Sequence, residues 1–387
     1  MAAEDPLELI RDQMAENLAR APNYTCLQTV ERARRPNTKS GFRTVDRLRL
    51  EVALVAGKEM FAWPGAGHFE DKSPGEMFPG GTTATGEYAM HAQTIFDSDA
   101  PEFGDGVEET LDGRRTLRYD FRVSRAMTNY WIQAGEARAL VPYRGSFWAD
   151  AATLDVRRLA LEVDEIPARL QVRRATTRIE YAKANIGASE FLLPVRVELV
   201  MALADGGESR NRTQFNGCKQ YGVETEISFE ELVESRRGED KKETVVQLPA
   251  GLTVETRLED TIDSQTAAIG DLVTARVTFA AKRDGKVVVP KGALLRGRLR
   301  RLERGGEQRS FHLVELEFLE VAWEGRRAPW RARLESAGPL VGSRRNSLRV
   351  PRDQAAGVAQ WVVEGGRVRV PQGFRMLWVA EGLPGGK

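Results

Sequence analysis

One short device recurs three times in the last third of this 387-residue chain: an apolar strand, then Pro-x-Gly, then another apolar strand. The copies are centred on Pro249–Gly251, Pro290–Gly292 and Pro371–Gly373. Proline fixes φ and lacks an amide donor, whereas glycine tolerates positive φ, so each copy ends one strand and redirects the next. A repeated turn of this kind is typical of the corners of a small, tightly coiled β-barrel.

The preceding two thirds of the chain also carry a β pattern. Apolar residues alternate with mainly charged or polar residues in several segments, which include residues 47–54, 116–123, 158–163 and 195–201. Strands with one apolar and one polar face are typical of an antiparallel sheet that is covered on one side. The turn sequence Asp112-Gly113 falls between two such strands, as expected for hairpins.

Residues 5–20 depart from this period and predict an amphipathic helix. Asp5 is a favourable N-cap, Pro6 suits the first helical position, and Glu8 completes a capping-box pattern. An apolar stripe follows at helical spacing, formed by Leu7, Ile10, Met14 and Leu18.

Length, charge and a change in composition set the domain organisation. The run at 230–243 is nearly all charged and predicts a linker, so we expect a first domain at 1–230, a linker at 231–243 and a second domain at 244–387. The 57 basic and 56 acidic side chains balance, which disfavours a nucleic-acid partner. No apolar run approaches the roughly 20 residues of a membrane span, so we expect no transmembrane segment.

The cellular compartment depends on two observations. The chain begins Met-Ala-Ala-Glu-Asp-Pro without a signal peptide, which fits either a cytosolic protein or a form from which a signal has been removed. Its two cysteines, Cys26 and Cys218, are either unrelated buried thiols or one disulfide that joins the first and last strands of the first domain. Their polar sequence contexts favour the disulfide, and with it an oxidising compartment.

Residues that usually carry chemistry are sparse. The three histidines, His68, His91 and His312, have no partners at metal-ligand spacing. No His-x-x-x-His, Cys-x-x-Cys or Gly-x-Ser-x-Gly element occurs in the sequence. We therefore expect no catalytic residues, no metal and no cofactor, and predict that the protein is not an enzyme.

Three features of the first domain occur together: an N-terminal helix that leads into the first strand, a hairpin at 145–159, and the segments 178–181 and 191–194. With these features the domain resembles the periplasmic lipoprotein-carrier family, the LolA type. The resemblance implies a strongly curved antiparallel half-barrel whose concave face is closed by helices and holds acyl chains. It also implies a periplasmic or otherwise exported protein.

In the second domain, the segments 248–252 and 288–297 place a proline and a glycine between apolar residues, as Pro-Lys-Gly in the second of them. In this pattern the domain resembles the C-terminal β-barrel of TrbI-like scaffold proteins of conjugation and type IV secretion channels. That family's membrane anchor, proline-rich stalk and apolar pore helices have no counterpart in this sequence. Together the two resemblances imply an all-β fold with minor α: a curved antiparallel half-barrel with an N-terminal helix, followed by a small β-barrel.

A long segment at 64–96 bears on a binding site. Its first part, 64–86, is rich in glycine and proline and predicts an irregular loop, and 87–96 predicts a short helix. We expect this segment to be either a mobile lid over a cavity on the concave face or a plug in the core. The candidate ligand-binding residues are Tyr88, Ile95, Phe96, Leu50, Val52, Tyr119 and Phe121.

These observations lead to one functional hypothesis and one alternative. The hypothesis is a non-catalytic bacterial envelope protein whose first domain binds a lipid or an acylated protein, while the second domain docks to an envelope protein. The alternative is a structural scaffold or assembly subunit of an envelope complex, without a small-molecule ligand.

Overall fold

The computed structural model describes most of the chain, namely residues 5–55, 57–66, 68–69, 72, 74–77, 82–84, 88–221, 244–306, 310–338, 350–351 and 354–381. The chain divides into two compact units, Met1–Thr44 with Leu50–Phe229, and Val45–Arg49 with Glu230–Lys387. The expected linker at 231–243 lies outside the described residues, so its role and the exact domain limits stay predictions. Both units are built mainly of strands, which confirms the predicted all-β class with minor α.

The first unit begins with helix α1 (Pro6–Arg20), as predicted. The Asp5 carboxylate accepts a hydrogen bond from the Leu7 amide at 3.0 Å and so caps the helix. Ile10 and Met14 are fully buried, whereas Leu7 and Leu18 at the ends of the apolar stripe are half-buried. The helix is therefore anchored by the middle of its apolar face.

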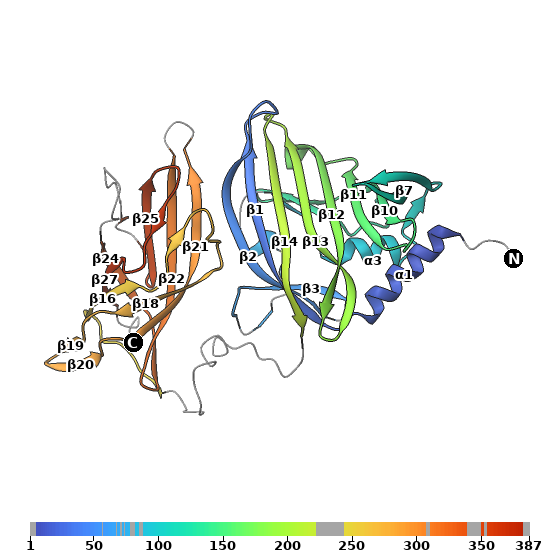
Figure 1. Ribbon diagram of the computed structural model, residues 1–387. Coiled ribbons are helices and arrows are strands. Elements are labelled where there is room, and N and C mark those ends of the chain that lie inside the picture. Colours follow the sequence, from blue (N-terminus) through green and yellow to red (C-terminus); the bar gives the residue numbers. More distant parts are fainter. Residues whose placement is uncertain are drawn as a thin grey trace. The chain divides into compact units, whose positions relative to one another are not determined.

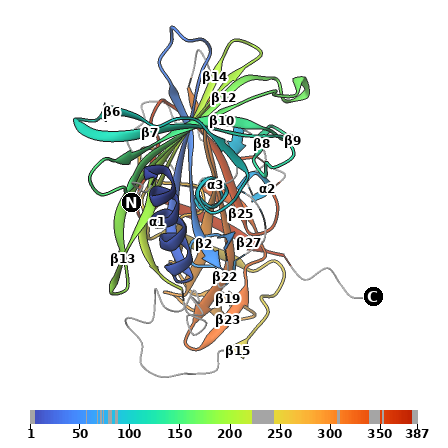
Figure 2. The same cartoon turned by 90° about the vertical axis from the view of Figure 1, so that its right-hand side faces the viewer.

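The first unit is dominated by one eleven-stranded sheet that curls into a half-barrel, with α1 and α3 inside its curve (Figure 1, Figure 2). Its strand order is β3-β2-β1-β14-β13-β12-β11-β10-β7-β5, and β6 pairs with β7. The strands are β1 (Tyr24–Arg35), β2 (Arg43–Val55), β3 (Lys58–Ala62), β5 (Pro101–Phe103), β6 (Val107–Leu111), β7 (Arg114–Val123), β10 (Tyr143–Asp150), β11 (Val156–Val163), β12 (Val172–Ile186), β13 (Ser189–Leu203) and β14 (Glu208–Gln220).

A glycine allows the sheet to coil tightly. Gly145 in β10 lies opposite Phe121 in β7 and Leu161 in β11. A Cβ atom at this position would stand 2.0 Å from the backbone oxygen of Ala160 and 2.9 Å from the Phe121 ring. Only glycine fits such close approach, so the curvature here depends on it.

In chain order, β1 is the first strand of this sheet and β14 the last; the two are neighbours in the sheet and are covalently joined. Their register shifts between Thr25 and Leu27, so that Gly217 and Cys218 together face Cys26. Gly217 has φ +60°, as the bulge requires. The disulfide between Cys26 and Cys218, with a Cα–Cα distance of 4.1 Å, confirms the predicted pairing.

Short elements fill the connection between β3 and β10. The expected irregular loop at 64–86 contains helix α2 (Pro74–Met77) and strand β4 (Thr82–Ala84) among its described residues. Strand β4 joins a small sheet of order β4-β8-β9, with β8 at Trp131–Ala134 and β9 at Ala137–Leu140. The predicted helix at 87–96 is α3 (Met90–Phe96), and a single 3₁₀ turn, η1, follows β11 at Ala168–Leu170.

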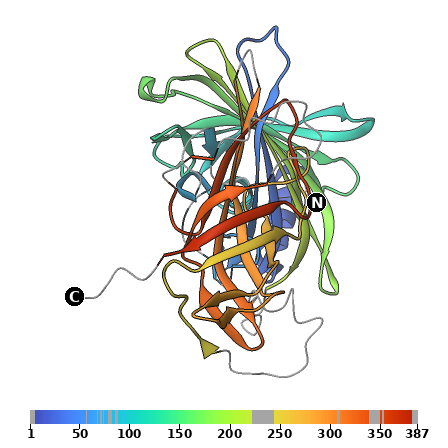
Figure 3. The ribbon, with the colours of Figure 1, turned by 90° about the vertical axis from the view of Figure 1, so that its left-hand side faces the viewer.

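The second unit contains a nine-stranded sheet of order β15-β23-β22-β21-β18-β16-β27-β24, with β25 beside β22 (Figure 3). Two smaller pairs, β17-β26 and β19-β20, complete it. The strands are β15 (Thr244–Val245), β16 (Thr253–Leu258), β17 (Ile262–Asp263), β18 (Leu272–Val277), β19 (Ala281–Arg283), β20 (Lys286–Val289), β21 (Leu294–Gly305), β22 (Phe311–Trp323), β23 (Arg326–Pro329), β24 (Ala332–Ala337), β25 (Val358–Glu364), β26 (Arg369–Val370) and β27 (Arg375–Ala380).

All three Pro-x-Gly copies turn the chain in the same way. Each proline carbonyl accepts a hydrogen bond from the amide three residues later, and Gly251, Gly292 and Gly373 have φ between +77° and +89°, as a type II turn requires. The glycine amide and the following carbonyl then bind the last residue of a neighbouring strand, which is Ala380, Val277 and Leu258 respectively. The device thus starts β16, β21 and β27 and fixes each start to a strand end.

Another glycine connects β24, at one end of this sheet, to β22, near the other end. The Gly357 amide donates to Ala332 in β24, and its carbonyl accepts from Phe318 in β22, at 2.9 and 2.8 Å. Gly357 has φ +83°, and a Cβ atom there would stand 2.8 Å from the Phe318 oxygen. The sheet therefore curls into the predicted small barrel around a core that includes Trp361 and Trp378, both fully buried.

Candidate functional site

The seven predicted ligand-binding residues all lie in the core of the first unit. None is more than 5% exposed. Leu50 and Val52 come from β2 and Tyr119 and Phe121 from β7, so they belong to strands near opposite ends of the sheet. The other three, Tyr88, Ile95 and Phe96, belong to residues 88–96, which run between these two parts of the sheet and which we call the crossing segment.

This crossing segment packs directly on the inner face of the sheet. The Tyr88 ring lies 5.3 Å from that of Tyr24 in β1 and 5.1 Å from that of Phe215 in β14. At the other end, the Phe96 ring contacts the Phe147 ring in β10 at 5.0 Å. The segment fills the inner face in this conformation, and whether it can leave as a lid stays a prediction.

A carboxylate fixes the start of α3. Oε1 of Glu59 accepts hydrogen bonds from the amides of Ala89 and Met90 at 2.8 and 3.0 Å. Burial raises the pKa of Glu59, and the hydrogen bonds from these amides offset part of that rise. The crossing segment is therefore tied to β3 through a carboxyl group that resists ionisation.

A hollow that the seven predicted ligand-binding residues do not line lies beside α1. It has a volume of about 250 Å³ and is bounded by α1, the β10–β11 turn and the facing ends of β12 and β13. Buried apolar side chains such as Ile10 and Met14 lie beside exposed polar ones, and its exposed lining is more polar than apolar. The lining residues are Ile10, Gln13, Met14, Glu16, Asn17, Arg20, Leu154, Asp155, Val156, Lys183, Glu190, Phe191 and Leu192, which we call the α1 groove.

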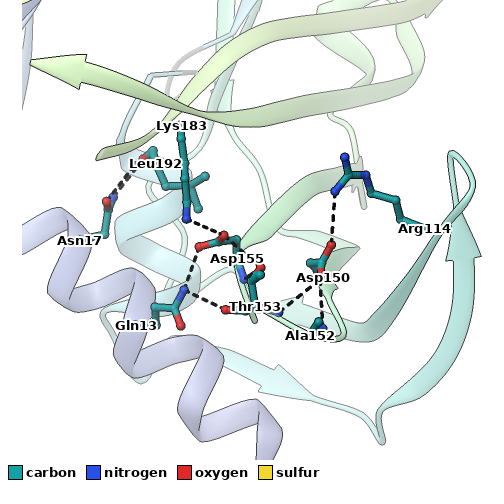
Figure 4. Close-up of polar contacts among 9 residues, drawn as sticks. All are labelled: Gln13, Asn17, Arg114, Asp150, Ala152, Thr153, Asp155, Lys183 and Leu192. Atoms are coloured by element: carbon teal, nitrogen blue, oxygen red, sulfur yellow. Dashed lines mark hydrogen bonds and ion pairs between the residues drawn. The ribbon is translucent and has the colours of Figure 1, made fainter. Parts of the chain in front are cut away.

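Two amide side chains hold α1 at one edge of the α1 groove (Figure 4). The Asn17 side chain donates to the backbone oxygen of Leu192 at 2.9 Å and accepts from the Leu192 amide at 2.8 Å. Gln13 donates to Asp155 at 2.9 Å and to the Thr153 carbonyl at 3.3 Å. These hydrogen bonds thus join α1 to the β12–β13 hairpin and to the β10–β11 hairpin.

The β10–β11 turn is pinned by its first residue. The Asp150 carboxylate accepts from the amides of Ala152 and Thr153 at 3.0 and 3.2 Å. The pKa of Asp150 is lowered, mainly by the hydrogen bond from the Ala152 amide and further by the Thr153 amide and nearby arginines. The turn presents Leu154 to the groove with φ +63°, a conformation that costs a leucine about 1–2 kcal/mol.

Opposite charges meet on the groove rim. Lys183 Nζ lies 3.0 Å from the Asp155 carboxylate, and this hydrogen bond raises the pKa of Lys183. Glu16 pairs loosely with Arg20 at 3.7 Å, and both are exposed. The rim of the α1 groove thus carries paired charges, and a ligand head group would have to compete with Asp155 for Lys183 or with Glu16 for Arg20.

A second hollow, of about 580 Å³, lies over β7 and β10–β13. Phe121 is the one predicted site residue that borders it. Its charged side chains neutralise one another, as in the contacts of Arg174 with Glu162 at 2.9 Å and of Arg144 with Asp164 at 2.9 Å. We assign it no ligand.

The described residues contain no cluster of three or more His, Cys, Asp or Glu that would hold a metal ion. Within the same residues, no helix is long and apolar enough to cross a membrane. The absence of catalysis stays a prediction.

Sequence reasoning missed the groove residues Gln13, Asn17, Asp155 and Lys183. One signal was present: Asn17 lies three residues after Met14, beside the apolar stripe of α1, where a polar amide requires a partner. The other three carry no local signal, because Gln13 and Asp155 are 142 residues apart and Lys183 and Asp155 are 28 apart. Asp155 also follows a turn whose left-handed residue is a leucine, which does not indicate that conformation.

Comparisons with known proteins identify no family for this chain. No family model and no curated protein matches the chain. Among solved structures, it is similar to a DUF1329 family protein from Desulfovibrio piger ATCC 29098, with 11% identity over 59% of this chain and 99% of that one and a TM-score of 0.32. It is also similar to a putative outer membrane lipoprotein-sorting protein domain from Vibrio parahaemolyticus, with 12% identity over 59% of this chain and 100% of that one and a TM-score of 0.30.

At these TM-scores, no property of the neighbours transfers to this chain. The resemblance of the second domain to TrbI-like barrels has no support from these comparisons and stays a prediction. The structural neighbours of the chain are thus a DUF1329 protein and a lipoprotein-sorting domain, both at low similarity.

Proposed function

We propose that this protein binds an apolar, acyl-bearing ligand without catalysis, and that the α1 groove takes part of that ligand. The α1 groove carries the proposal because apolar side chains, Leu154, Phe191 and Leu192 among them, line it next to polar ones, a combination that suits a short hydrocarbon segment beside a polar head. Its volume of about 250 Å³ is below the roughly 300–1,000 Å³ of sites that enclose a whole drug-sized ligand. It therefore suits the end of an acyl chain or its carbonyl region.

The strained leucine supports this proposal. Glycine or asparagine would adopt the conformation of Leu154 at lower cost, yet a large apolar side chain stands there and lines the groove. Backbone strain of this kind clusters at binding and catalytic sites. We therefore assign Leu154 the role of contacting the apolar part of the ligand.

The disulfide supports an oxidising compartment. Disulfides persist in oxidising compartments and are rare in the cytosol. The bond between Cys26 and Cys218 supports a periplasmic or otherwise exported protein, in keeping with the lipoprotein-carrier resemblance. We expect its partner to be a lipid or an acylated envelope protein.

A fluorescent fatty-acid titration tests the binding. We expect saturable binding by the wild type and about tenfold weaker binding by Leu154→Asn, because an amide replaces a partly buried leucine. Both Leu154→Asn and Leu154→Gly should keep or raise the melting temperature, since both relieve the left-handed strain.

Gln171→Gly is the matched control, because Gln171 also has a positive φ, +52°, and does not line the groove. It should leave binding unchanged. No saturable binding by the wild type, or equal affinities for all four proteins, would contradict the proposal.

The alternative, a scaffold subunit without a small ligand, has one observation in its favour. The crossing segment leaves the inner face of the sheet filled by buried side chains such as Tyr88 and Phe96. Phe96→Asp tests whether this segment is a plug or a lid: at a plug it should mainly destabilise the fold, whereas at a lid it should mainly alter fatty-acid uptake.

A further inference from the structure

The β19–β20 hairpin of the second unit has features that the proposed ligand site does not use. The two strands form a two-stranded sheet of their own, and Figure 1 shows them standing out from the main sheet of their unit. Asp284 and Gly285 at the tip both have positive φ, +49° and +77°, as in a tight type I′ hairpin turn. We call residues 279–291 the hairpin arm.

The base of the hairpin arm is fixed in the core. Ala281 and Val289 are 5% and 0% exposed. Arg283 Nη1 donates to the Ala250 carbonyl at 2.6 Å, which fastens the arm to the first Pro-x-Gly turn. The exposed side chains of the arm are therefore held on a defined support.

Large apolar side chains point to solvent on this arm. The register shifts between Ala281 and Lys282, so that Val287 pairs with Lys282 although it is only two residues from buried Val289. Such a shift turns the following side chain to the other face. As a result, Val287 is 53% exposed, and Phe279 just before β19 is 64% exposed.

The same arm is basic. Three of the chain's eleven lysines fall within ten residues, at 282, 286 and 291, in a chain that has about four times as many arginines. With Arg283, and against the single acid Asp284, the hairpin arm has an excess of three positive charges. On neighbouring β16, Glu255 is already ion-paired with Arg375 at 2.9 Å.

Protection of a sheet edge against self-association accounts for the lysines alone. It does not account for Phe279 and Val287, because exposed apolar residues on a hairpin promote association. A surface that complements both features must be negatively charged and must accept apolar side chains. The interface of an anionic phospholipid bilayer has both properties.

We propose that the hairpin arm docks the second unit on an anionic phospholipid surface. Lys282, Lys286 and Lys291 contact the lipid phosphates, while Phe279 and Val287 insert among the glycerol and upper acyl regions. This site is independent of the α1 groove, and its test needs no ligand in that groove.

Vesicle co-sedimentation of the full chain tests the docking. We expect binding to vesicles of phosphatidylcholine with 30% phosphatidylglycerol, because about a third of anionic lipid attracts basic segments. We expect little binding to vesicles of pure phosphatidylcholine. Lys282→Gln with Lys286→Gln should weaken binding on the order of 20-fold, about fivefold per lysine, and added salt should act in the same direction.

Matched controls keep charge and hydrophobicity separate. Lys39→Gln with Lys219→Gln removes two other exposed lysines, and Leu319→Ser removes a side chain that is 51% exposed elsewhere in the second unit. Both should bind like the wild type, whereas Phe279→Ser should bind several-fold more weakly. Circular dichroism should show all variants folded.

Two outcomes would overturn the proposal. One is equal vesicle binding by the arm variants and their controls, or no binding by the wild type. The other is capture of polyglutamate that depends on the lysines and not on Phe279, without vesicle binding, which would identify an acidic protein as the partner.

Discussion

Removal of the disulfide gives the sharpest test of how the first unit is held together. Cys26 and Cys218 are 192 residues apart in sequence, and their strands β1 and β14 are adjacent in the sheet. In the chain-entropy description, a cross-link that closes a loop of this length contributes about 5 kcal/mol, because it restricts the unfolded chain. Cys26→Ala with Cys218→Ala should lower the free energy of unfolding by up to that amount.

The native state should change little in this variant. Residues on both sides of the bridge keep their antiparallel pairing, from Tyr24 with Gln220 to Arg35 with Glu208. The Tyr88 hydroxyl loses its contact with Cys26 Sγ at 3.1 Å but keeps its hydrogen bond with Tyr24, so it is not left without a partner. The expected loss is therefore mainly the entropic one.

Hydrogen exchange with mass spectrometry in increasing urea measures the effect for each unit separately. Peptides of the first unit should lose protection at lower urea, while those of the second unit serve as an internal reference and stay unchanged. Reductant should destabilise the wild type to a similar extent and leave the double variant unaffected. A loss below about 1 kcal/mol, or two free thiols in unreduced, denatured protein, would refute the reasoning.

Three further predictions follow from single contacts. Gly145→Ala should destabilise the first unit by at least about 2 kcal/mol, because the added Cβ atom would clash with the Ala160 carbonyl. Adding Ala160→Gly leaves that carbonyl in place and should not restore stability. An unchanged melting temperature for Gly145→Ala would contradict the role of Gly145 in coiling the sheet. Gly357→Ala should destabilise the second unit by a similar amount, read from its exchange midpoint, whereas Gly325→Ala, which meets no atom within 4 Å, should show only the cost of its positive φ. The raised pKa of Glu59 means that the folded state binds a proton more tightly than the unfolded chain, so the stability that this group contributes is full below the ordinary carboxyl range and is lost as pH rises through the raised pKa. The free energy of unfolding of Glu59→Gln, measured in urea, should therefore increase relative to that of the wild type as pH rises. Parallel pH curves for the two proteins would exclude the effect.

Local signals predicted the elements of the fold well, because local chemistry determines them. The Asp5 cap, the alternation around Leu50 and Val52, and the three Pro-x-Gly turns each act within a few residues, and the structure has them where the sequence indicates. Strand order is different. The adjacency of β1 and β14 depends on a pairing across nearly the whole first unit, for which the two cysteines were the only sequence signal used.

The candidate site was harder to predict for a physical reason. Apolar alternation reports which side chains are buried, and it does not distinguish a side chain that lines an empty cavity from one that packs in a core. Tyr88, Ile95 and Phe96 are buried as expected, but in this structure their neighbours are other side chains. The α1 groove arises from contacts between distant segments, as between Gln13 and Asp155, which no local pattern encodes.

The place of β14 between β1 and β13 has a consequence for synthesis. Strand β1 leaves the ribosome or a translocation channel early, but its partner on one side follows only after about 190 further residues. At roughly 5–20 residues per second, the edge of β1 stays unpaired for about 10 to 40 seconds. A newly made chain thus presents an open strand edge for far longer than hairpins need to form, and a factor that covers β1 during this interval should raise the yield of folded protein.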